Sequence, residues 1–301
     1  MVIYLIEKFK KEYLGRSIVT VLGIVIILVT LSITGFLFYK GLGTFVTYNH
    51  SVWEFLFSSE WKPADNFDGG GKVGAAIFIV GSLLISFLAL LIATPFSIAS
   101  AVFMTEISPK LGKKLLQPAI GIFVGIPSVV YGWVGLTVLV PAIAHVFNLP
   151  YGFSVLAGGI VLALMIFPTI TSVSVDAIEN VDNGYKEASY ALGTTRWQYI
   201  YKVMLPSATS GILTGVILGL ARAFGEALAV AMVIGKMLTF PDNILSATNN
   251  MTAEIASDMG NSAQGGEFND ALWSMALLLL IISFIFILIM RIIAKKGEEV
   301  K

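Results

Sequence analysis

Cysteine is absent from the 301-residue sequence, and histidine occurs only at His50 and His145. Without cysteine the chain can form no disulfide, no thiolate metal site and no cysteine nucleophile, and two distant histidines argue against histidine-based metal catalysis. Charged residues make up only 13% of the chain and hydrophobic residues 56%, whereas a soluble domain is about a quarter charged. The mean hydropathy is +0.86. This composition excludes a soluble enzyme, a disordered chain and a disulfide-stapled secreted domain, and it indicates a membrane protein.

A phosphate-cradling loop of the form G-x-x-x-x-G-K-[ST] is also absent. The Gly-Lys pairs begin at Gly71, Gly112 and Gly235, and none of them is followed by serine or threonine. The formal net charge is zero, so the chain has no overall electrostatic footprint for nucleic acid. If this protein depends on ATP, a separate chain must therefore hydrolyse it.

Long apolar runs are what the sequence has in abundance. A helix needs about 20 residues to cross the roughly 30 Å hydrocarbon core of a bilayer, and six runs are long enough. We therefore predict an all-α polytopic membrane protein, with an N-terminal segment 1–16, a six-helix transmembrane domain 17–294 and a tail 295–301. The predicted spans are 17–39, 73–103, 118–146, 153–175, 208–235 and 271–294.

Lysine and arginine predict the orientation of these spans, because cytoplasmic loops carry an excess of both. With the N-terminus inside, fourteen of them lie in inside segments and four in outside loops, and Arg222 lies within a span. We therefore expect a multi-pass protein of the cytoplasmic (cell) membrane with both termini in the cytoplasm. The inside residues are Lys8, Lys10, Lys11, Arg16, Lys110, Lys113, Lys114, Lys186, Arg196, Lys202, Arg291, Lys295, Lys296 and Lys301. The outside residues are Lys40, Lys62, Lys72 and Lys236.

The segment 177–207, between the fourth and fifth spans, is predicted to form two short cytoplasmic helices. Gly193 would end the first, because glycine readily adopts positive φ, and Thr194 or Thr195 would cap the second. Pro206 would end the second helix just before the fifth span. Such a helix outside the membrane either lies on lipid headgroups or docks on a partner protein. Its apolar stripe, with helical spacing, consists of Trp197, Ile200, Tyr201 and Met204.

The same segment resembles the EAA loop of ABC-importer permeases, whose pattern is EAA, three residues, G, nine residues and I-x-L-P. The matching positions are Glu187, Ala188, Ser189, Gly193, Val203, Leu205 and Pro206, with Ser189 and Val203 as mild departures. The resemblance implies the type I ABC-importer permease fold and a coupling helix that docks on a separate ATPase subunit. It also implies a homologous second permease, an extracytoplasmic binding protein, and ATP and Mg on the ATPase. This chain would then be a transporter subunit without a cofactor of its own, and no enzyme.

Two charges lie four residues apart within the fifth apolar run, at Arg222 and Glu226. A charge in hydrocarbon is costly, and opposite charges at i and i+4 of one helix can neutralise each other. Gly211, Gly215 and Gly219 fall on the same helix face, where small residues let another helix come close. The pair either only fixes helix register or presents Arg222 to an anion path, with Glu226 holding the guanidinium.

The stretch from Ala221 to Glu226 resembles the A-R-A-x-G-E motif of phosphate, sulfate and molybdate importer permeases. Segments 59–63, 126–132 and 229–235 resemble the phosphate (Pst) branch, in particular its PstC permeases. The resemblance implies a permease subunit of an ATP-driven phosphate importer, which forms the translocation path with its homologous partner. Sulfate, molybdate or phosphonate is the alternative substrate. An ion-coupled secondary transporter is the alternative in another class, but it needs intramembrane carboxylates, and Glu226 is the only clear one.

Pro127 interrupts the third apolar run, between Gly125 and Gly135. Proline removes one helix hydrogen bond, and Ser128 and Tyr131 place a hydroxyl and a phenol nearby. Either the helix is broken here and lines the translocation path with Ser128 and Tyr131, or the site is a proline kink stabilised by packing.

Overall fold

The computed structural model describes residues 15–299, so residues 1–14 and 300–301 of the predicted terminal segments lie outside the described residues. Six described helical segments are long and apolar enough to cross a membrane, which confirms the predicted all-α, six-span fold. These segments are Gly15–Val46, Ala76–Ile107, Ser128–Val146, Val155–Glu179, Arg196–Gly225 and Glu267–Lys295.

Several spans consist of consecutive helical elements. In chain order the α-helices and strands are α2 (Gly15–Gly41), α3 (Gly43–Val46), α4 (Val52–Phe57), β1 (Trp61–Lys62), β2 (Lys72–Val73), α5 (Ala76–Val102), α6 (Pro109–Leu111), α7 (Gln117–Gly125), α8 (Ser128–Val134), α9 (Val140–Val146), α10 (Val155–Glu179), α11 (Asn183–Ala191), α12 (Arg196–Tyr199), α13 (Leu205–Gly225), α14 (Leu228–Ala231), α15 (Met251–Asp258) and α16 (Glu267–Glu299). Four π-helical turns occur in the described chain: η2 (Phe103–Ile107), η3 (Gly112–Leu116), η4 (Gly135–Leu139) and η5 (Ile200–Met204).

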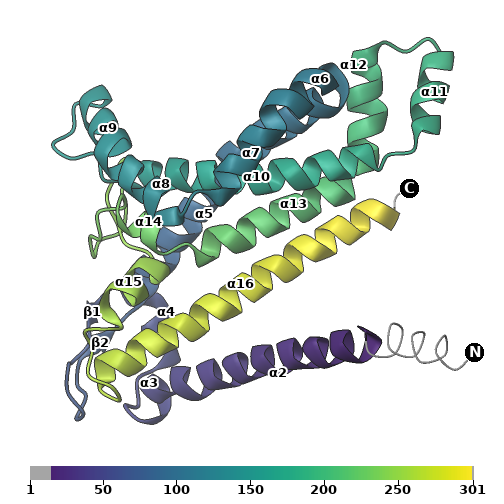
Figure 1. Ribbon diagram of the computed structural model, residues 1–301. Helices are drawn as coiled ribbons and strands as arrows, with labels where there is room; N and C mark the ends of the chain where they lie inside the picture. Colours follow the sequence, from purple (N-terminus) through teal and green to yellow (C-terminus); the bar gives the residue numbers. More distant parts are fainter. Residues whose placement is uncertain (1–14, 300–301) are drawn as a thin grey trace, which may run out of the picture.

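Helix α10 is the centre of the fold and packs against both α5 and α13 (Figure 1). Its residues Leu162, Ile166 and Ile170 belong to one buried cluster with Ile85 of α5. Helix α13 approaches closely through its glycine stripe, since a Cβ added at Gly219 would lie 2.7 Å from Cγ1 of Ile170. The predicted close helix contact along this stripe is therefore confirmed, and α10 is the helix it meets.

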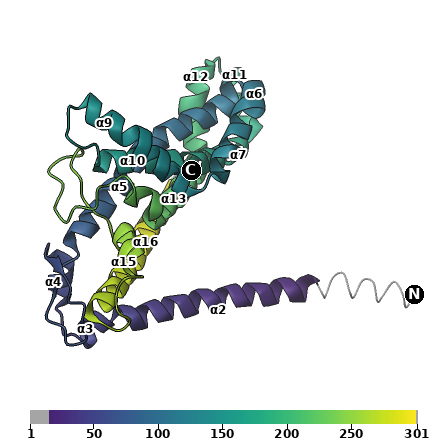
Figure 2. The same ribbon diagram turned by 60° about the vertical axis from the view of Figure 1, so that its left-hand side comes forward.

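Helix α2 lies apart from this core. At its end it packs on α16, where the rings of Phe36 and Trp273 meet edge to face with centroids 5.2 Å apart. Toward its start at Gly15 it diverges from the other helices (Figures 1 and 2). Apolar side chains such as Ile26, which is 66% exposed, cover it. These side chains are left to contact lipid or another chain.

The two ends of the molecule carry different elements (Figure 1). We call the end with α4, β1, β2 and α15 the α15 end, and the end with α6, α11 and α12 the α11 end. At the α15 end, Glu267 at the start of α16 is fully buried. It accepts hydrogen bonds from the backbone N–H of Ala64 at 2.6 Å and of Gly71 at 2.9 Å, and it contacts Nε2 of His50 at 2.6 Å. This one carboxylate ties the long loop before α5 to α16.

Two of the predicted spans are interrupted by breaks in the helix. Over 118–146 the chain is extended at Ile126 (ψ 126°) and Pro127 (ψ 142°), so the spanning segment begins only at Ser128. Proline lacks the N–H that a continuous helix needs, and it disfavours a helical conformation for the preceding residue. Over 208–235 the helix ends at Gly225, where glycine weakens it, and Glu226 is extended (ψ 120°).

Candidate functional site

Arg222 is a charged side chain within the helical core. It lies in the last turn of α13, and its Nη1 donates a hydrogen bond to Oγ1 of Thr169, in the interior of α10, at 3.3 Å. Two residues further on, the ring of Phe224 stacks on that of Phe286, in the interior of α16, with centroids 5.6 Å apart. Arg222 therefore lies level with the middle parts of α10 and α16, and not at either end of the molecule.

Glu226 does not neutralise Arg222, so the predicted i, i+4 ion pair is wrong. The ion pairs within 4.0 Å among the described residues all involve other side chains. Oε1 of Glu226 instead accepts from the N–H of Ala229 at 3.0 Å, and its carbonyl oxygen accepts from Oγ1 of Thr252 at 2.8 Å. The pair would need one continuous helix, and α13 ends at Gly225, between the two residues. Arg222 is therefore left without a carboxylate partner in the described chain.

Tyr131 holds the break in the third span. Its hydroxyl donates to the carbonyl oxygen of Phe123 at 2.8 Å, which is one of the carbonyls left without a partner where α7 ends. The extended backbone at 126–127 confirms a broken helix and not a mere kink. A hollow of about 370 Å³ with an apolar lining lies beside Tyr131. Since the phenol is engaged in this way, Ser128, which is half-buried and has no hydrogen-bond partner within 15–299, is the hydroxyl left to meet another group.

Helices α11 and α12 form the loop whose sequence resembles the EAA loop. Gly193 ends α11 with φ +78°, as predicted from the tolerance of glycine for this conformation. Thr195 caps α12 through a capping box with Gln198. The hydroxyls of Ser189 and Thr194 lie 2.6 Å apart across the turn. The side chains of the loop itself therefore set the angle between the two helices.

The predicted apolar stripe divides between two environments, so the prediction of one exposed stripe is wrong. Trp197 and Tyr201 are 65% and 54% exposed, whereas Ile200 and Met204 are buried. Ile200 and Met204 pack in a cluster with residues of α5 and α10, because this helix meets the core on one side of the stripe. Leu192 is 84% exposed, and it was not among the residues predicted for this surface. The pattern that could have identified it is a leucine directly before the glycine that ends α11. We call Leu192, Trp197 and Tyr201 the dock residues.

Pro206 does not end the second helix, contrary to the prediction. The elements α12, η5 and α13 follow one another without a break from Arg196 to Gly225. In η5 the hydrogen bonds span five residues, and Leu205 donates to the carbonyl oxygen of Ile200. Pro206 then falls in the first turn of α13, where a missing N–H is tolerated. Trp197 and Arg222 consequently lie on one continuous helical segment.

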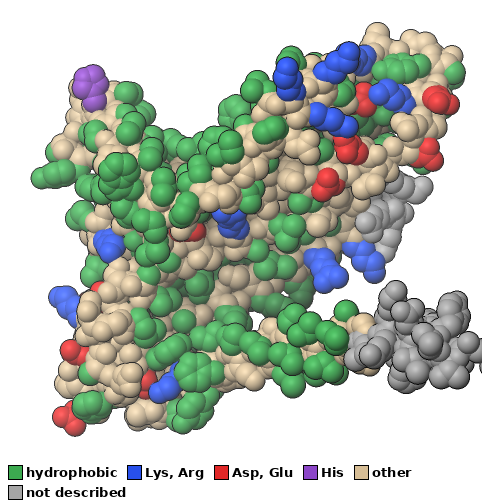
Figure 3. Space-filling model, viewed as in Figure 1, with side chains coloured by type: hydrophobic (Ala, Val, Ile, Leu, Met, Phe, Trp, Pro, Cys, Tyr) green, Lys and Arg blue, Asp and Glu red, His purple; other side chains and the backbone are tan. Residues whose placement is uncertain are grey.

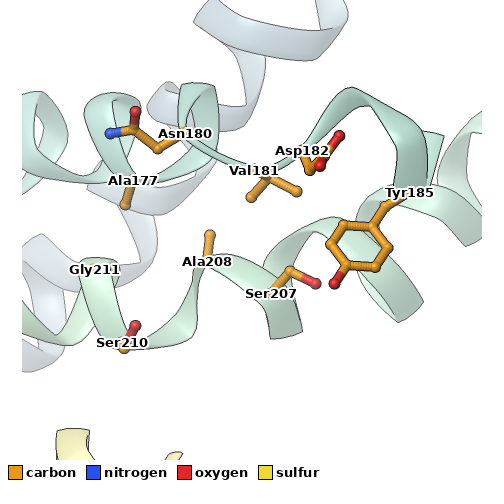
Figure 4. Close-up of a pocket in the computed structure, with 9 residues that line it drawn as sticks. All are labelled: Ala177, Asn180, Val181, Asp182, Tyr185, Ser207, Ala208, Ser210 and Gly211. Carbon is orange, nitrogen blue, oxygen red and sulfur yellow. The ribbon is translucent and has the colours of Figure 1, made fainter. Parts of the chain in front are cut away.

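A polar hollow of about 430 Å³ opens between the start of α11 and the start of α13 (Figure 4). Tyr185 of α11 and Asp182, which caps that helix, line it on one side, and Ser207 and Ser210 line it from α13. The side chains of Tyr185 and Ser207 face each other at this hollow (Figure 4).

Glu254 is a buried carboxyl group at the α15 end. It lies on α15, its side chain is almost fully buried, and its Oε2 accepts from Nδ2 of Asn249 at 2.8 Å. Burial, together with the neighbouring Asp258 charge, raises the pKa of the Glu254 carboxyl from its ordinary value of 4.5 to about 7. In the part of the chain that the structure describes, no three histidine, aspartate or glutamate side chains are grouped as metal ligands.

Replacement of Glu254 by glutamine is expected to raise stability at pH 8 and to change it little at pH 5. The native state keeps a proton that the unfolded chain loses, so the free energy of unfolding falls as the pH rises from 4.5 to about 7. The slope is at most about 1.4 kcal/mol per pH unit. The amide stays neutral and removes this slope. The measurement is the thermal midpoint of detergent-solubilised protein from pH 5 to pH 8, with Glu60→Gln, an exposed carboxyl at the same end, as control. The prediction would be wrong if the thermal midpoints of the wild type and Glu254→Gln differed by the same amount at pH 5 and at pH 8.

Lysine and arginine side chains gather on the surface of the α11 end (Figure 3). The start of α2 at Gly15 and the end of α16 lie at this same end (Figure 1). The basic residues of the helices and turns here are Lys110, Lys113, Lys114, Lys186, Arg196 and Lys202. The fold therefore brings together the basic segments that the sequence counts assigned to one side of the membrane.

Known sequences resemble the chain over most of its length. Residues 93–297 match the family described as "Binding-protein-dependent transport system inner membrane component". The chain is 49% identical over 287 residues to the "Probable ABC transporter permease protein YqgH" of Bacillus subtilis (strain 168), which covers 95% of this chain and 92% of that protein. It is 33% identical over 312 residues to the "Phosphate transport system permease protein PstC" of Pasteurella multocida (strain Pm70), with 96% and 94% covered.

Solved structures share the fold at lower identity. A chain of the bacterial alginate ABC transporter, in complex with an alginate-bound periplasmic protein, superposes with a TM-score of 0.63 at 16% identity and 96% coverage of both chains. A chain of the inward-facing MetNI methionine ABC transporter superposes with a TM-score of 0.54 at 19% identity, covering 73% of this chain and 92% of that one. This is the type I ABC-importer permease fold, in systems whose ATPase is a separate subunit. The chain therefore belongs to the family of binding-protein-dependent transport system inner membrane components, as a multi-pass ABC permease of the PstC type and not an enzyme.

Proposed function

We propose that this protein is a membrane permease subunit of an ATP-driven phosphate importer. Its relative in Pasteurella multocida is named a phosphate transport system permease, and the similarity covers almost the whole of both chains. The observation within the chain that carries the proposal is Arg222. Its guanidinium lies in the helical core and has a hydroxyl partner, Thr169, but no carboxylate partner in the described chain. An intramembrane cation of this kind favours an anion in the path, and a guanidinium can donate two hydrogen bonds to a tetrahedral oxyanion.

In this proposal Arg222 lines the translocation path between this permease and a homologous second permease. Glu226 and Tyr131 shape the path by holding the two helix breaks, and Ser128 offers its hydroxyl to the anion. Phosphate fits this set because it can accept from Arg222 and also donate a hydrogen bond, whereas sulfate can only accept.

The α11 end is proposed to face the cytoplasm, with both termini on that side, because the basic side chains gather there. The dock residues would enter a cleft of a separate ATPase subunit, which binds ATP and Mg. Glu187 and Ala188 are exposed beside them. The other residues predicted to couple to the ATPase would orient this surface: buried Ser189, Gly193 at the turn, buried Ile200, and Leu205 and Pro206 at the start of α13. An extracytoplasmic binding protein would deliver phosphate at the α15 end.

Uptake by proteoliposomes that contain the permease with its co-expressed partner subunits tests the proposal. We expect ³²P-phosphate uptake to require ATP on the α11 side and to be inhibited by unlabelled phosphate far more strongly than by equal sulfate or molybdate. Equal inhibition by sulfate or molybdate would overturn the choice of phosphate. Uptake driven by a proton or sodium gradient without ATP would instead support a secondary transporter.

A further inference from the structure

Glu106, in the turn η2 that ends the second span, is bound to α11. Both of its carboxylate oxygens accept from Nζ of Lys186, at 2.8 and 3.0 Å. The Glu106 side chain is only 11% exposed, so solvent screens this pair less than a surface pair. Nζ of Lys186 also lies 5.6 Å from the ring centroid of Tyr199, which is buried on α12. The ion pair therefore joins the middle of α11 to the end of the second span.

A second cation of the same loop binds the same turn. Nη2 of Arg196, the first residue of α12, donates to the carbonyl oxygen of Ile107 at 3.1 Å. Ile107 ends η2, and Ser108 leaves the helical conformation with φ −144° and ψ 75°. A helix end leaves such carbonyls without a partner, and the helix dipole favours a cation there. Both helices of the loop thus hold the end of the second span through a charged side chain.

Apolar contacts reinforce this connection. Ala101 and Val102 of α5 share a buried cluster with Tyr199, Ile200 and Met204 of the α12–η5 segment. On its other side the start of α11 borders the hollow that it shares with the start of α13 (Figure 4). The loop is therefore clamped to the second span as well as being continuous with the fifth.

The beginning of α5 contacts the opposite end of the molecule. Oγ of Ser82 accepts from the N–H of Met251, the first residue of α15, at 3.0 Å, and both residues are buried. Gly81 lies directly against the carbonyl oxygen of Asn249, where an added Cβ would collide. The helical segment runs without a break from Ala76 to Ile107. One helical segment thus contacts α11 and α12 at one end and the start of α15 at the other.

We propose that Glu106 is a positioning residue for coupling, and that the second span transmits displacements of α11 and α12 to α15. The inference rests on the proposed function, since it concerns how ATP-driven movement of the dock residues reaches the far end. The fifth span ends at Gly225 and meets α15 through the carbonyl oxygen of Glu226, which accepts from Oγ1 of Thr252 at 2.8 Å. The second span meets the start of α15 from within its helix, through Gly81 and Ser82, and its contacts at both ends form a contiguous path of packed and hydrogen-bonded groups.

Charge reversal in the complete transporter tests this inference. Because the chain contains no cysteine, Ala256→Cys, at an exposed position of α15, reports movement at the α15 end through its labelling rate with a water-soluble maleimide. We expect Glu106→Lys and Lys186→Glu each to lower phosphate uptake per ATP hydrolysed about tenfold, which is ~1.4 kcal/mol of coupling. Each should also abolish the change in labelling on addition of ATP. The double reversal should restore both quantities to within about threefold of wild type, because it rebuilds the pair.

Lys202→Glu is the matched control, because Lys202 is an exposed lysine of the same loop without an ion pair in the described chain. It should leave both quantities unchanged, and Glu106→Gln, which keeps an oxygen acceptor for Lys186, should keep most of the coupling. Wild-type coupling in the single reversals would overturn the inference. So would a stably assembled double reversal as defective as either single one. If the wild-type complex takes up phosphate with ATP but its labelling at position 256 does not respond to ATP, the inference fails and the proposed function stands. Uptake that does not require ATP would overturn the proposed function itself.

Discussion

Replacement of Arg222 by methionine is expected to abolish most phosphate uptake while the permease still folds and inserts. Methionine keeps an unbranched apolar stem and removes the guanidinium that donates to Thr169. Removal of the guanidinium removes its charge-assisted hydrogen bonds to the anion, which are worth ~2 kcal/mol or more, so we expect uptake to fall by at least about thirtyfold. The measurement is ATP-dependent ³²P-phosphate uptake by proteoliposomes, with the thermal midpoint in detergent as a check of folding. Since methionine removes a charge from the apolar core, the midpoint should not fall.

Glu226→Gln is the matched control for Arg222→Met. Glutamine retains a side-chain oxygen that can accept from the N–H of Ala229, and Glu226 forms no ion pair with Arg222. Uptake should therefore remain within about threefold of wild type, because the one hydrogen bond that the side chain makes is preserved. A Glu226→Gln defect as large as that of Arg222→Met would show that the two residues act as a charged pair. Normal uptake by Arg222→Met would exclude Arg222 from the anion path.

Gly193→Val is expected to have the second large effect, a loss of ATP-driven uptake with normal membrane insertion. Gly193 has φ +78°, and nothing lies within 4 Å of an added Cβ, so the strain falls on the backbone alone. A residue with a Cβ pays about 1–2 kcal/mol in this conformation, and a β-branched one pays more. The turn would relax toward negative φ and rotate α12 relative to α11. Trp197 would then leave its position at the dock, and cross-linking of Trp197→Cys to the ATPase subunit should be lost together with uptake.

Gly184→Val provides the comparison within the same loop. Gly184 lies in the first turn of α11 and does not have positive φ. An added Cβ there would approach only the side chain of Asp182, with Oδ1 at 3.2 Å and Cγ at 3.8 Å. This variant should keep its uptake and its cross-link from position 197. Equal losses in both variants would mean that added bulk, and not the left-handed turn, causes the defect.

The sequence by itself determined the class of the protein and its local backbone features. Six spanning segments follow from hydrophobicity summed over about 20 residues, which is a local property of the chain. The turn at Gly193 and the cap at Thr195 were also predictable, because they depend on one residue's φ preference and one side chain's reach. The spacing of the EAA resemblance led to the correct family for the same reason, since it is a covalent distance along the chain.

Only the tertiary structure decided which side of a helix meets the core. Trp197, Ile200, Tyr201 and Met204 share one helical stripe, but two of them are buried, because α5 and α10 cover one edge of it. Hydrophobic periodicity identifies an apolar face, and it does not say whether that face meets the chain itself or a partner.

Tertiary packing also decided where the spans are interrupted and which groups pair with the charged side chains. Arg222 and Glu226 have ideal spacing for a pair, yet the helix ends between them, and Thr169 of α10 and the N–H of Ala229 in α14 become their partners. Glu106 and Lys186 are 80 residues apart and pair closely because the fold brings η2 beside α11. Spacing along the chain predicts contacts only where one regular element holds both residues, and a contact between elements depends on how those elements pack.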